Sequence, residues 1–283
     1  MTYVQKLEGG IGNQLFQYFK AVDFCLDMNC ELILDFKDVY LGKVLHGSLI
    51  SSIQLPVDFK SVNKNPNRLK IMRGRALKSL QKLLSVKFEN SGEKYSIEVP
   101  DSQDSKFYDR VSRKFPGWSA TLVSESEWFK KLRSLAHHEE FIAIHIRRGD
   151  YTQGRNALTI GLLDFSYYMR GLDLVHSRLG NLPVWVFSDD PEYILGKIHN
   201  LPKKSRIIVA PENSDPAETL LLMSLAKGFV LSNSTFSWWS ARFSHEDSVK
   251  VVPTPWFRNL PQPISLIPTS WECVTSVWEN NGG

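Results

Sequence analysis

The sequence has few cysteines, and none of them has the spacing of a metal site. The 283 residues include only Cys25, Cys30 and Cys273. This sparse pattern excludes a disulfide-rich scaffold and a zinc finger, and it favours reduced thiols packed inside a cytoplasmic protein.

Long apolar runs are also lacking. No segment approaches the ~18 uninterrupted apolar residues of a membrane-spanning helix. The first residues, MTYVQKLEGG, lack the basic region and apolar stretch of a secretory signal. The net charge of +4 is too small to indicate nucleic-acid binding. We therefore expect a cytoplasmic protein that binds no nucleic acid.

Carboxylate clusters suited to a divalent cation are missing as well. No Asp-x-Asp motif occurs, and Asp189 and Asp190 are adjacent, so on an extended chain their side chains point in opposite directions. Because Mg²⁺ needs convergent oxygen ligands, the sequence predicts a site without metal. We expect no cofactor, with arginines in place of the cation.

The N-terminal part has the pattern of a β-α-β unit. Residues 3–7 and 31–36 are short strand-like runs, and a helical apolar pattern begins at Asn13. The loop between them, residues 8–12, is rich in glycine. Gly10-x-Gly12 also resembles part of a dinucleotide fingerprint, so an NAD-type oxidoreductase is one alternative. Against it, Leu15 stands where the third glycine belongs.

The C-terminal half contains four short and almost wholly apolar runs. Such runs are typical of parallel strands that are buried on both faces of a sheet. They are residues 141–146, 184–187, 228–231 and 249–252. With the N-terminal pattern they predict an α/β protein of two domains, residues 1–135 and residues 136–283.

Polar side chains follow the first three of these runs directly. The segments are 147–150 (Arg-Arg-Gly-Asp), 188–190 (Ser-Asp-Asp) and 232–235 (Ser-Asn-Ser-Thr). Ligands of open α/β sheets bind beyond the carboxyl ends of the strands, so the three segments are expected to converge. Paired arginines suit a diphosphate, because the guanidinium group binds phosphate oxygens bidentately.

Each of these features also has a purely structural interpretation. His145 within a strand could be an ordinary core histidine, and Asp190 could cap the helix that begins at Pro191. Trp238 and Trp239 could be core residues. Their occurrence at successive strand ends favours the functional interpretation.

Residues 60–88 contain many lysines and arginines but no acidic residue. They predict either a helix with a solvated basic face or a basic amphipathic surface. Such a surface would face an acidic partner or make peripheral contact with anionic lipid at the inner face of a membrane.

Three motifs carry a resemblance to a known family. They are GGIGNQLFQY at residues 9–18, HIRRGDY at residues 145–151 and SNSTFSWWSA at residues 232–241. In this order they resemble the α-1,2-fucosyltransferases of glycosyltransferase family 11. The resemblance implies a GT-B-like fold of two Rossmann-like α/β domains facing a cleft. Residues 1–135 would carry the glycine loop on the acceptor side, and residues 136–283 would bind GDP-fucose.

The same resemblance implies the reaction. It is the inverting, metal-independent transfer of L-fucose from GDP-β-L-fucose to the 2-hydroxyl of a terminal galactose on an oligosaccharide, as in O-antigen or H-type antigen synthesis. The alternative on this fold is a non-catalytic module that binds a sugar nucleotide or a glycan.

The resemblance also implies roles for single residues. Arg147 would hold the β-phosphate and stabilise departing GDP, and Arg148 would be secondary, on phosphate or in an ion pair. His145 and Asp190 resemble the guanine and ribose contacts. The remaining donor-binding residues implied are Gly10, Gly12, Asn13, Ser234, Thr235 and Phe236.

Two points stay open. Asp150 is the nearest motif carboxylate that could act as the catalytic base, but Arg148 could pair with it, and a path without a strong base is also open. The family pattern places an aspartate where this chain has Thr219, and the preceding Glu218 could substitute for it.

Overall fold

The computed structural model describes residues 2–39, 50–62, 103–152 and 154–279. These residues form two compact units. The first takes its residues from 1–50, 55–102 and 106–118, and the second from 51–54, 103–105 and 119–283. The predicted domain boundary at residue 135 stays a prediction. The predicted basic helix within residues 60–88 lies almost wholly outside the described residues.

The first unit contains the predicted β-α-β opening. Strands β1 (Thr2–Lys6) and β2 (Glu31–Asp35) pair in parallel, and β4 (Lys60–Val62) extends the sheet beside β2. Helix α1 (Ile11–Met28) connects the first two strands. It begins two residues before Asn13 because Gly10, with an extended backbone, is its N-cap.

Helix α1 is held in the first unit by its apolar face and by two ion pairs. The side chains on that face are fully or almost fully buried, namely Leu15, Phe16, Phe19 and Val22. Helix α4 (Ser105–Lys114) supplies Arg110, whose Nε donates to both carboxylate oxygens of buried Asp23 at 2.9 Å. With the exposed ion pair between Lys114 and Asp27, at 3.2 Å, this contact ties α4 to α1.

The second unit is built on a six-stranded parallel sheet in the order β11-β10-β9-β6-β7-β8. All four apolar runs predicted to be strands are confirmed. They are β6 (Ile142–Ile146), β7 (Val184–Ser188), β9 (Gly228–Val230) and β10 (Val249–Thr254). The two edge strands, β8 (Arg206–Ile208) and β11 (Glu272–Thr275), were not predicted from the sequence. All of their side chains except that of Ile208 are at least partly exposed.

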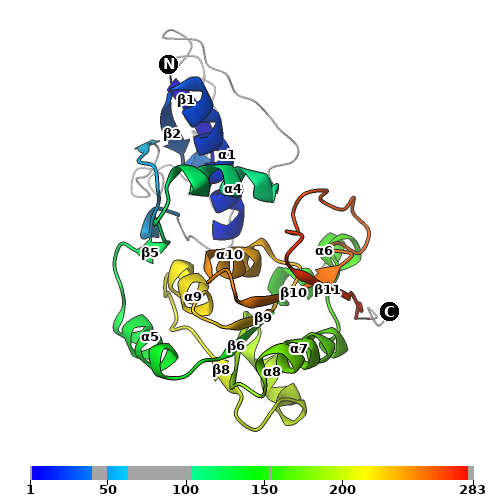
Figure 1. The fold of residues 1–283 in the computed structure, drawn as a ribbon. Helices are drawn as coiled ribbons and strands as arrows, with labels where there is room; N and C mark the ends of the chain where they lie inside the picture. Colours follow the sequence, from blue (N-terminus) through cyan, green and yellow to red (C-terminus); the bar gives the residue numbers. More distant parts are fainter. Residues whose placement is uncertain (1, 40–49, 63–102, 153, 280–283) are drawn as a thin grey trace, which may run out of the picture. The chain divides into compact units, whose positions relative to one another are not determined.

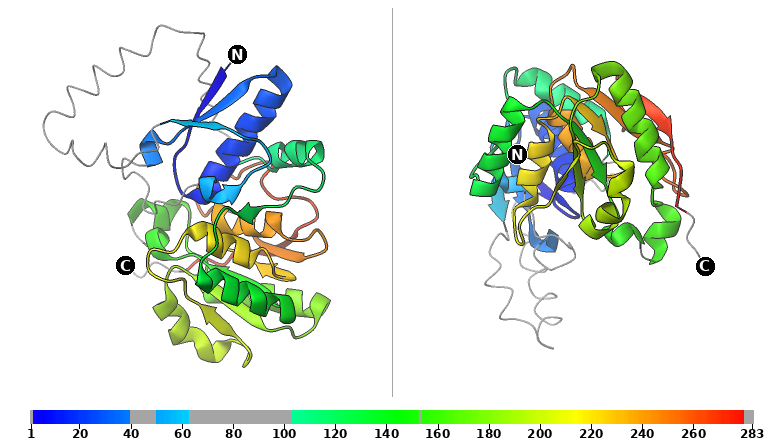
Figure 2. Two further views of the ribbon diagram at one scale, coloured as in Figure 1. Left: turned by 90° about the vertical axis from the view of Figure 1, so that its left-hand side faces the viewer. Right: turned by 90° about the horizontal axis from the view of Figure 1, so that it is seen from below.

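Helices cover both faces of this sheet (Figures 1 and 2). Helix α7 (Phe165–Leu179) packs on one face, where a Cβ atom on Gly171 would lie 2.6 Å from Val230 Cγ1. Glycine is therefore required for this close approach of helix and strand. Helices α9 (Pro216–Met223) and α10 (Thr235–Phe243) lie together on the other face.

Shorter elements complete the second unit. Strands β3 (Ile53–Gln54) and β5 (Thr121–Leu122) form a small antiparallel sheet. The unit's other helical elements are α5 (Glu127–His138), η3 (Gly149–Thr152), α6 (Gly154–Thr159), α8 (Pro191–Lys197) and η4 (Ile198–Asn200). The short helix η2 (Ile50–Ser52) has its first residue in the first unit and the other two in the second.

The chain reverses its direction of travel across the sheet between β6 and β9. From β6 it proceeds to β7 and β8 on one side, and from β9 to β10 and β11 on the other. The carboxyl ends of β6 and β9 therefore lie at a topological switch point, which is the usual position of a ligand site in an open α/β sheet.

Candidate active site

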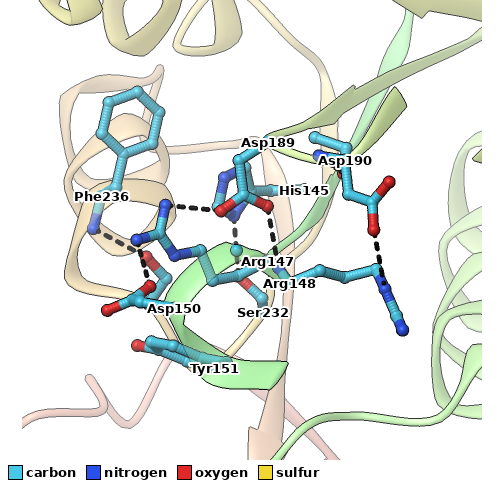
Figure 3. Close-up of polar contacts among 12 residues, drawn as sticks. His145, Arg147, Arg148, Asp150, Tyr151, Asp189, Asp190, Ser232 and Phe236 are labelled. Carbon is cyan, nitrogen blue, oxygen red and sulfur yellow. Dashed lines mark hydrogen bonds and ion pairs between the residues drawn. The ribbon is translucent and has the colours of Figure 1, made fainter. Parts of the chain in front are cut away.

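Arg147 lies between two carboxylates just beyond the end of β6 (Figure 3). Its Nη1 is 2.7 Å from Asp189 Oδ2, and its Nη2 is 2.5 Å from Asp150 Oδ1. The guanidinium carbon is also 5.5 Å from the centre of the Tyr151 ring. About a fifth of the Arg147 side chain remains exposed, so the group is fixed in position and still accessible.

Asp189 is the more firmly held of these two carboxylates. Its Oδ1 accepts the backbone N–H of Arg148 at 2.8 Å, while Oδ2 binds the Arg147 side chain. Gly149 leaves room for it, because a Cβ atom there would collide with Asp189 Oδ2. This role of Asp189 was not predicted from the sequence.

Arg148 points away from Arg147 (Figure 3). It forms ion pairs with Glu279 and with Asp190, and its guanidinium carbon lies 3.6 Å from the centre of the Tyr193 ring. Burial lowers the pKa of Arg148, but the hydrogen bond and charge of Glu279 outweigh this and raise the pKa above its usual value. These contacts favour the ion-pair interpretation of Arg148 over a phosphate ligand.

One expectation about carboxylates is corrected, and the possible substitution of Glu218 for the family aspartate stays a prediction. Asp150 pairs with Arg147 and not with Arg148. Glu218, in the first turn of α9, is buried and accepts both the backbone N–H and the hydroxyl of Ser126, at 2.6 and 2.8 Å. Since Ser126 caps α5, Glu218 joins these two helices.

Asp190 has the structural role that the sequence left open. It is the N-cap of α8 and accepts the backbone N–H of Tyr193 at 3.0 Å. Its other oxygen lies 3.3 Å from Arg148 Nε. Whether it also contacts a nucleotide stays a prediction.

His145 links the ends of β6 and β9. Its Nδ1 is 2.7 Å from the hydroxyl oxygen of Ser232, and its ring lies 5.5 Å from that of Phe236. Burial, followed by the positive charge of Arg147, lowers the pKa of His145 to about 3. The imidazole is therefore neutral at physiological pH and does not add charge beside Arg147.

The third motif forms the start of α10. Ser234 caps the helix by accepting the backbone N–H of Phe236 at 3.3 Å, and Thr235 is its first residue. Asn233 is fixed by bonds to the carbonyls of Ile160 and Gly161. Helix N-termini favour anions, so this segment adds a second element suited to phosphate. The core interpretation of Trp238 and Trp239 is confirmed, because both are fully buried.

The predicted glycine-loop residues belong to the first unit. Gly10 caps α1, and Gly12 and Asn13 lie in the first turn of that helix. Gln14 stabilises the loop by donating to the carbonyl of Gly9 at 3.0 Å. The other predicted site residues, from His145 to Phe236, all lie in the second unit at the carboxyl ends of β6, β7 and β9.

Within the described parts of the chain, no group of three or more His, Cys, Asp or Glu residues is placed to hold a metal ion. Metal independence stays a prediction. In the same residues, no helix is long and apolar enough to cross a membrane.

The fold and these motifs define the class of protein. The family model "Glycosyl transferase family 11" matches residues 122–260. An Escherichia coli alpha-1,2-colitosyltransferase is 30% identical over 271 residues, which cover 90% of this chain and 92% of that protein. The chain belongs to glycosyltransferase family 11, and it is accordingly a sugar-transferring enzyme.

Two further proteins are similar over a part of the chain or in fold. The Escherichia coli O-antigen biosynthesis glycosyltransferase WbnK is 30% identical over 138 residues, which cover 48% of this chain and 45% of that protein. The crystal structure of fucosyltransferase NodZ from Bradyrhizobium matches with a TM-score of 0.51 at 12% identity, covering 86% of this chain and 92% of that one. The predicted GT-B-like α/β fold is confirmed.

Proposed function

We propose that the enzyme transfers L-fucose, with inversion, from GDP-β-L-fucose to the 2-hydroxyl of a terminal galactose on an oligosaccharide. One observation carries the proposal: Arg147 is fixed by Asp150 and Asp189 at the switch point of the sheet, and part of its side chain is exposed. The three fucosyltransferase-like motifs and the family membership support it.

Arg147 acts on the leaving group. As the bond between the sugar and the β-phosphate breaks, negative charge develops on GDP. A guanidinium group that is already fixed in place stabilises this charge without further reorganisation, and one such donor contributes about 3–4 kcal/mol. The start of α10 at Ser234 and Thr235 supplies further donors to the phosphates.

Donor binding changes the pairing of Arg147. With two carboxylates on one guanidinium group, the cluster carries a net negative charge, which opposes an anionic diphosphate. Asp189 is also bound to the Arg148 backbone. Among the described residues, the Asp150 carboxylate bonds only to Arg147, and it is the more exposed of the two. The phosphate therefore displaces Asp150, which is then free to accept the proton of the acceptor hydroxyl.

The base of the nucleotide lies near His145 and Asp190 in this proposal. His145 Nδ1 is occupied by Ser232, so Nε2 of the neutral ring is the atom available to a nucleotide. No metal and no cofactor take part, because Arg147 supplies the positive charge that a cation supplies elsewhere.

Colitose is the second candidate for the transferred sugar, because the relative that spans most of the chain is named as an alpha-1,2-colitosyltransferase. Colitose is L-fucose without its 3-hydroxyl group, so both sugars fit the same linkage. The acceptor is proposed to be an O-antigen or another galactose-terminated glycan, and WbnK, named for O-antigen biosynthesis, supports the first. A cytoplasmic location and peripheral membrane contact remain part of the proposal.

Ligand-induced shifts of melting temperature test the donor class. GDP is expected to raise the melting temperature, whereas NAD is not. Initial transfer rates with GDP-fucose and GDP-colitose then identify the sugar. A shift with NAD alone would support the dinucleotide oxidoreductase, and GDP binding without transfer of either sugar to any galactoside would support the binding module.

A further inference from the structure

We propose that Glu279 is a positioning residue for the transfer reaction, acting through Arg148 on the loop that carries Arg147 and Asp150. This inference rests on the proposed function, because it assigns to Arg147 the stabilisation of the leaving group. Glu279 lies far along the sequence from the HIRRGDY motif and in no recognised motif.

Glu279 is the principal partner of Arg148. Its Oε1 forms an ion pair with Arg148 Nη1 and also accepts the hydroxyl of Tyr193 at 3.0 Å. Arg148 Cζ lies over the Tyr193 ring, 3.6 Å from its centre. Glu279 thus binds the edge of the Arg148 guanidinium group, and Tyr193, which Glu279 also binds, packs on its face.

Asp190 does not replace Glu279 in this arrangement. It contacts only Arg148 Nε, at 3.3 Å, and its other oxygen is committed to the N-terminus of α8. The Arg148 side chain is only 13% exposed, so loss of Glu279 leaves a mostly buried cation with one long ion pair. Such a group is expected to move toward water.

The backbone holds Glu279 rigidly. Its N–H donates to the carbonyl of Leu162 at 2.8 Å, and its carbonyl accepts from Arg258 Nη1 at 3.2 Å. The neighbouring Trp278 packs on Gly161, where a Cβ atom would lie 2.7 Å from the indole ring. The carboxylate is therefore a fixed point against which Arg148 is positioned.

Arg148 in turn sets the path of the motif loop. Its carbonyl accepts the N–H groups of Tyr151 and Thr152, at 2.7 and 3.1 Å, and closes the short helix η3. Its own N–H is bound to Asp189, the carboxylate that fixes Arg147. A shift of Arg148 thus moves Arg147 and Asp150 together. A displacement of ~1 Å at a reacting group can cost about 10²-fold in rate.

The test compares Glu279→Gln with a matched control, Glu272→Gln. Glu272 lies in the same C-terminal segment, in β11, and pairs with the exposed Arg178 on the surface. Two properties are measured on the full-length enzyme. They are kcat/KM for transfer, and amide hydrogen exchange in peptides that cover residues 147–152. Arg148→Met and the double variant Arg148→Met/Glu279→Gln complete a thermodynamic cycle.

We expect Glu279→Gln to lower kcat/KM by roughly 10- to 100-fold and to speed exchange in residues 147–152, while Glu272→Gln stays within twofold of wild type. Because Glu279 acts through Arg148, the double variant should be no worse than Arg148→Met alone. Three outcomes would each overturn the inference. They are a loss of kcat/KM in the double variant that is the product of the two single losses, wild-type activity of Glu279→Gln, and unchanged exchange in residues 147–152.

A failure of the proposed function gives a different experimental result from a failure of the inference on Glu279. In that case wild-type enzyme neither binds GDP nor transfers a sugar from it, and this is seen before any variant is made. Exchange in residues 147–152 needs no donor, so it still decides whether Glu279 holds the loop.

Discussion

Replacement of Arg147 by lysine separates the charge of this residue from its shape. Arg147 uses two different nitrogens for its two partners, Nη1 for Asp189 and Nη2 for Asp150. A lysine ammonium keeps the positive charge but concentrates it at one atom. It can neutralise the two carboxylates in part, but it cannot present the two planar nitrogens that the diphosphate is proposed to bind.

The expected loss follows from this geometry. Removing one preorganised donor from the site of developing charge costs about 3–4 kcal/mol, which corresponds to 10²–10³ in kcat. The fold should be little affected, because a cation still lies between Asp150 and Asp189, both of which are partly exposed. The free energy of unfolding should change by about 1 kcal/mol or less.

The assay is the initial rate of sugar transfer under saturating donor, with unfolding by urea measured on the same preparations. Arg178→Lys is the control, since Arg178 forms an exposed ion pair with Glu272. Arg147→Lys with more than a tenth of wild-type kcat would refute the assigned role. So would a loss of activity that only follows a loss of folded protein.

Three further predictions concern neighbouring groups. His145 has a folded pKa of about 3, below the ~6.5 of the unfolded chain, so the unfolded state takes up the proton first and stability falls as the pH drops below 6.5. Between pH 7 and pH 5 this effect lowers the free energy of unfolding of the wild-type protein by about 2 kcal/mol. In urea unfolding, the loss of stability of His145→Gln over the same pH range should be smaller by that amount. Equal losses in the two proteins would contradict the lowered pKa of His145. Asp150→Asn should tighten GDP binding by about two- to fivefold in calorimetry, because a competing charge beside Arg147 is removed, and weaker binding would argue against displacement. Glu218→Gln should lower the free energy of unfolding by about 1.5–3 kcal/mol, since a buried acceptor of two bonds from Ser126 is altered, without changing kcat of the folded enzyme. A loss of kcat in Glu218→Gln without a loss of stability would instead indicate that Glu218 has a role in the active site.

The sheet of the second unit was largely predictable, because strands buried on both faces leave a clear sequence pattern. Each of β6, β7, β9 and β10 contains an almost wholly apolar run, and the polar residues at the ends of the first three do converge. The edge strands β8 and β11 were not predictable in this way. An edge strand has one partner and exposed side chains, so its sequence resembles that of a loop.

The sequence brought the candidate site residues of the second unit together at the strand ends, but it did not show how they pair with one another. Sequence spacing placed Arg147, Arg148 and Asp150 in one loop, but it could not show which arginine each carboxylate binds. Asp189 and Asp190 follow β7 side by side, and only the alternation of an extended chain hinted that they serve different partners. Glu279 carries no signal at all, because its contact with Arg148 depends on how the C-terminal segment returns past the sheet.

The most direct test of the proposed function is product analysis. The purified enzyme is incubated with GDP-fucose, excess EDTA and a panel of β-galactosides, and products are identified by mass and by linkage. The account predicts an α-1,2-fucosylated galactoside that forms at an undiminished rate in EDTA. Transfer that EDTA abolishes, a different linkage, or no binding of GDP would contradict it.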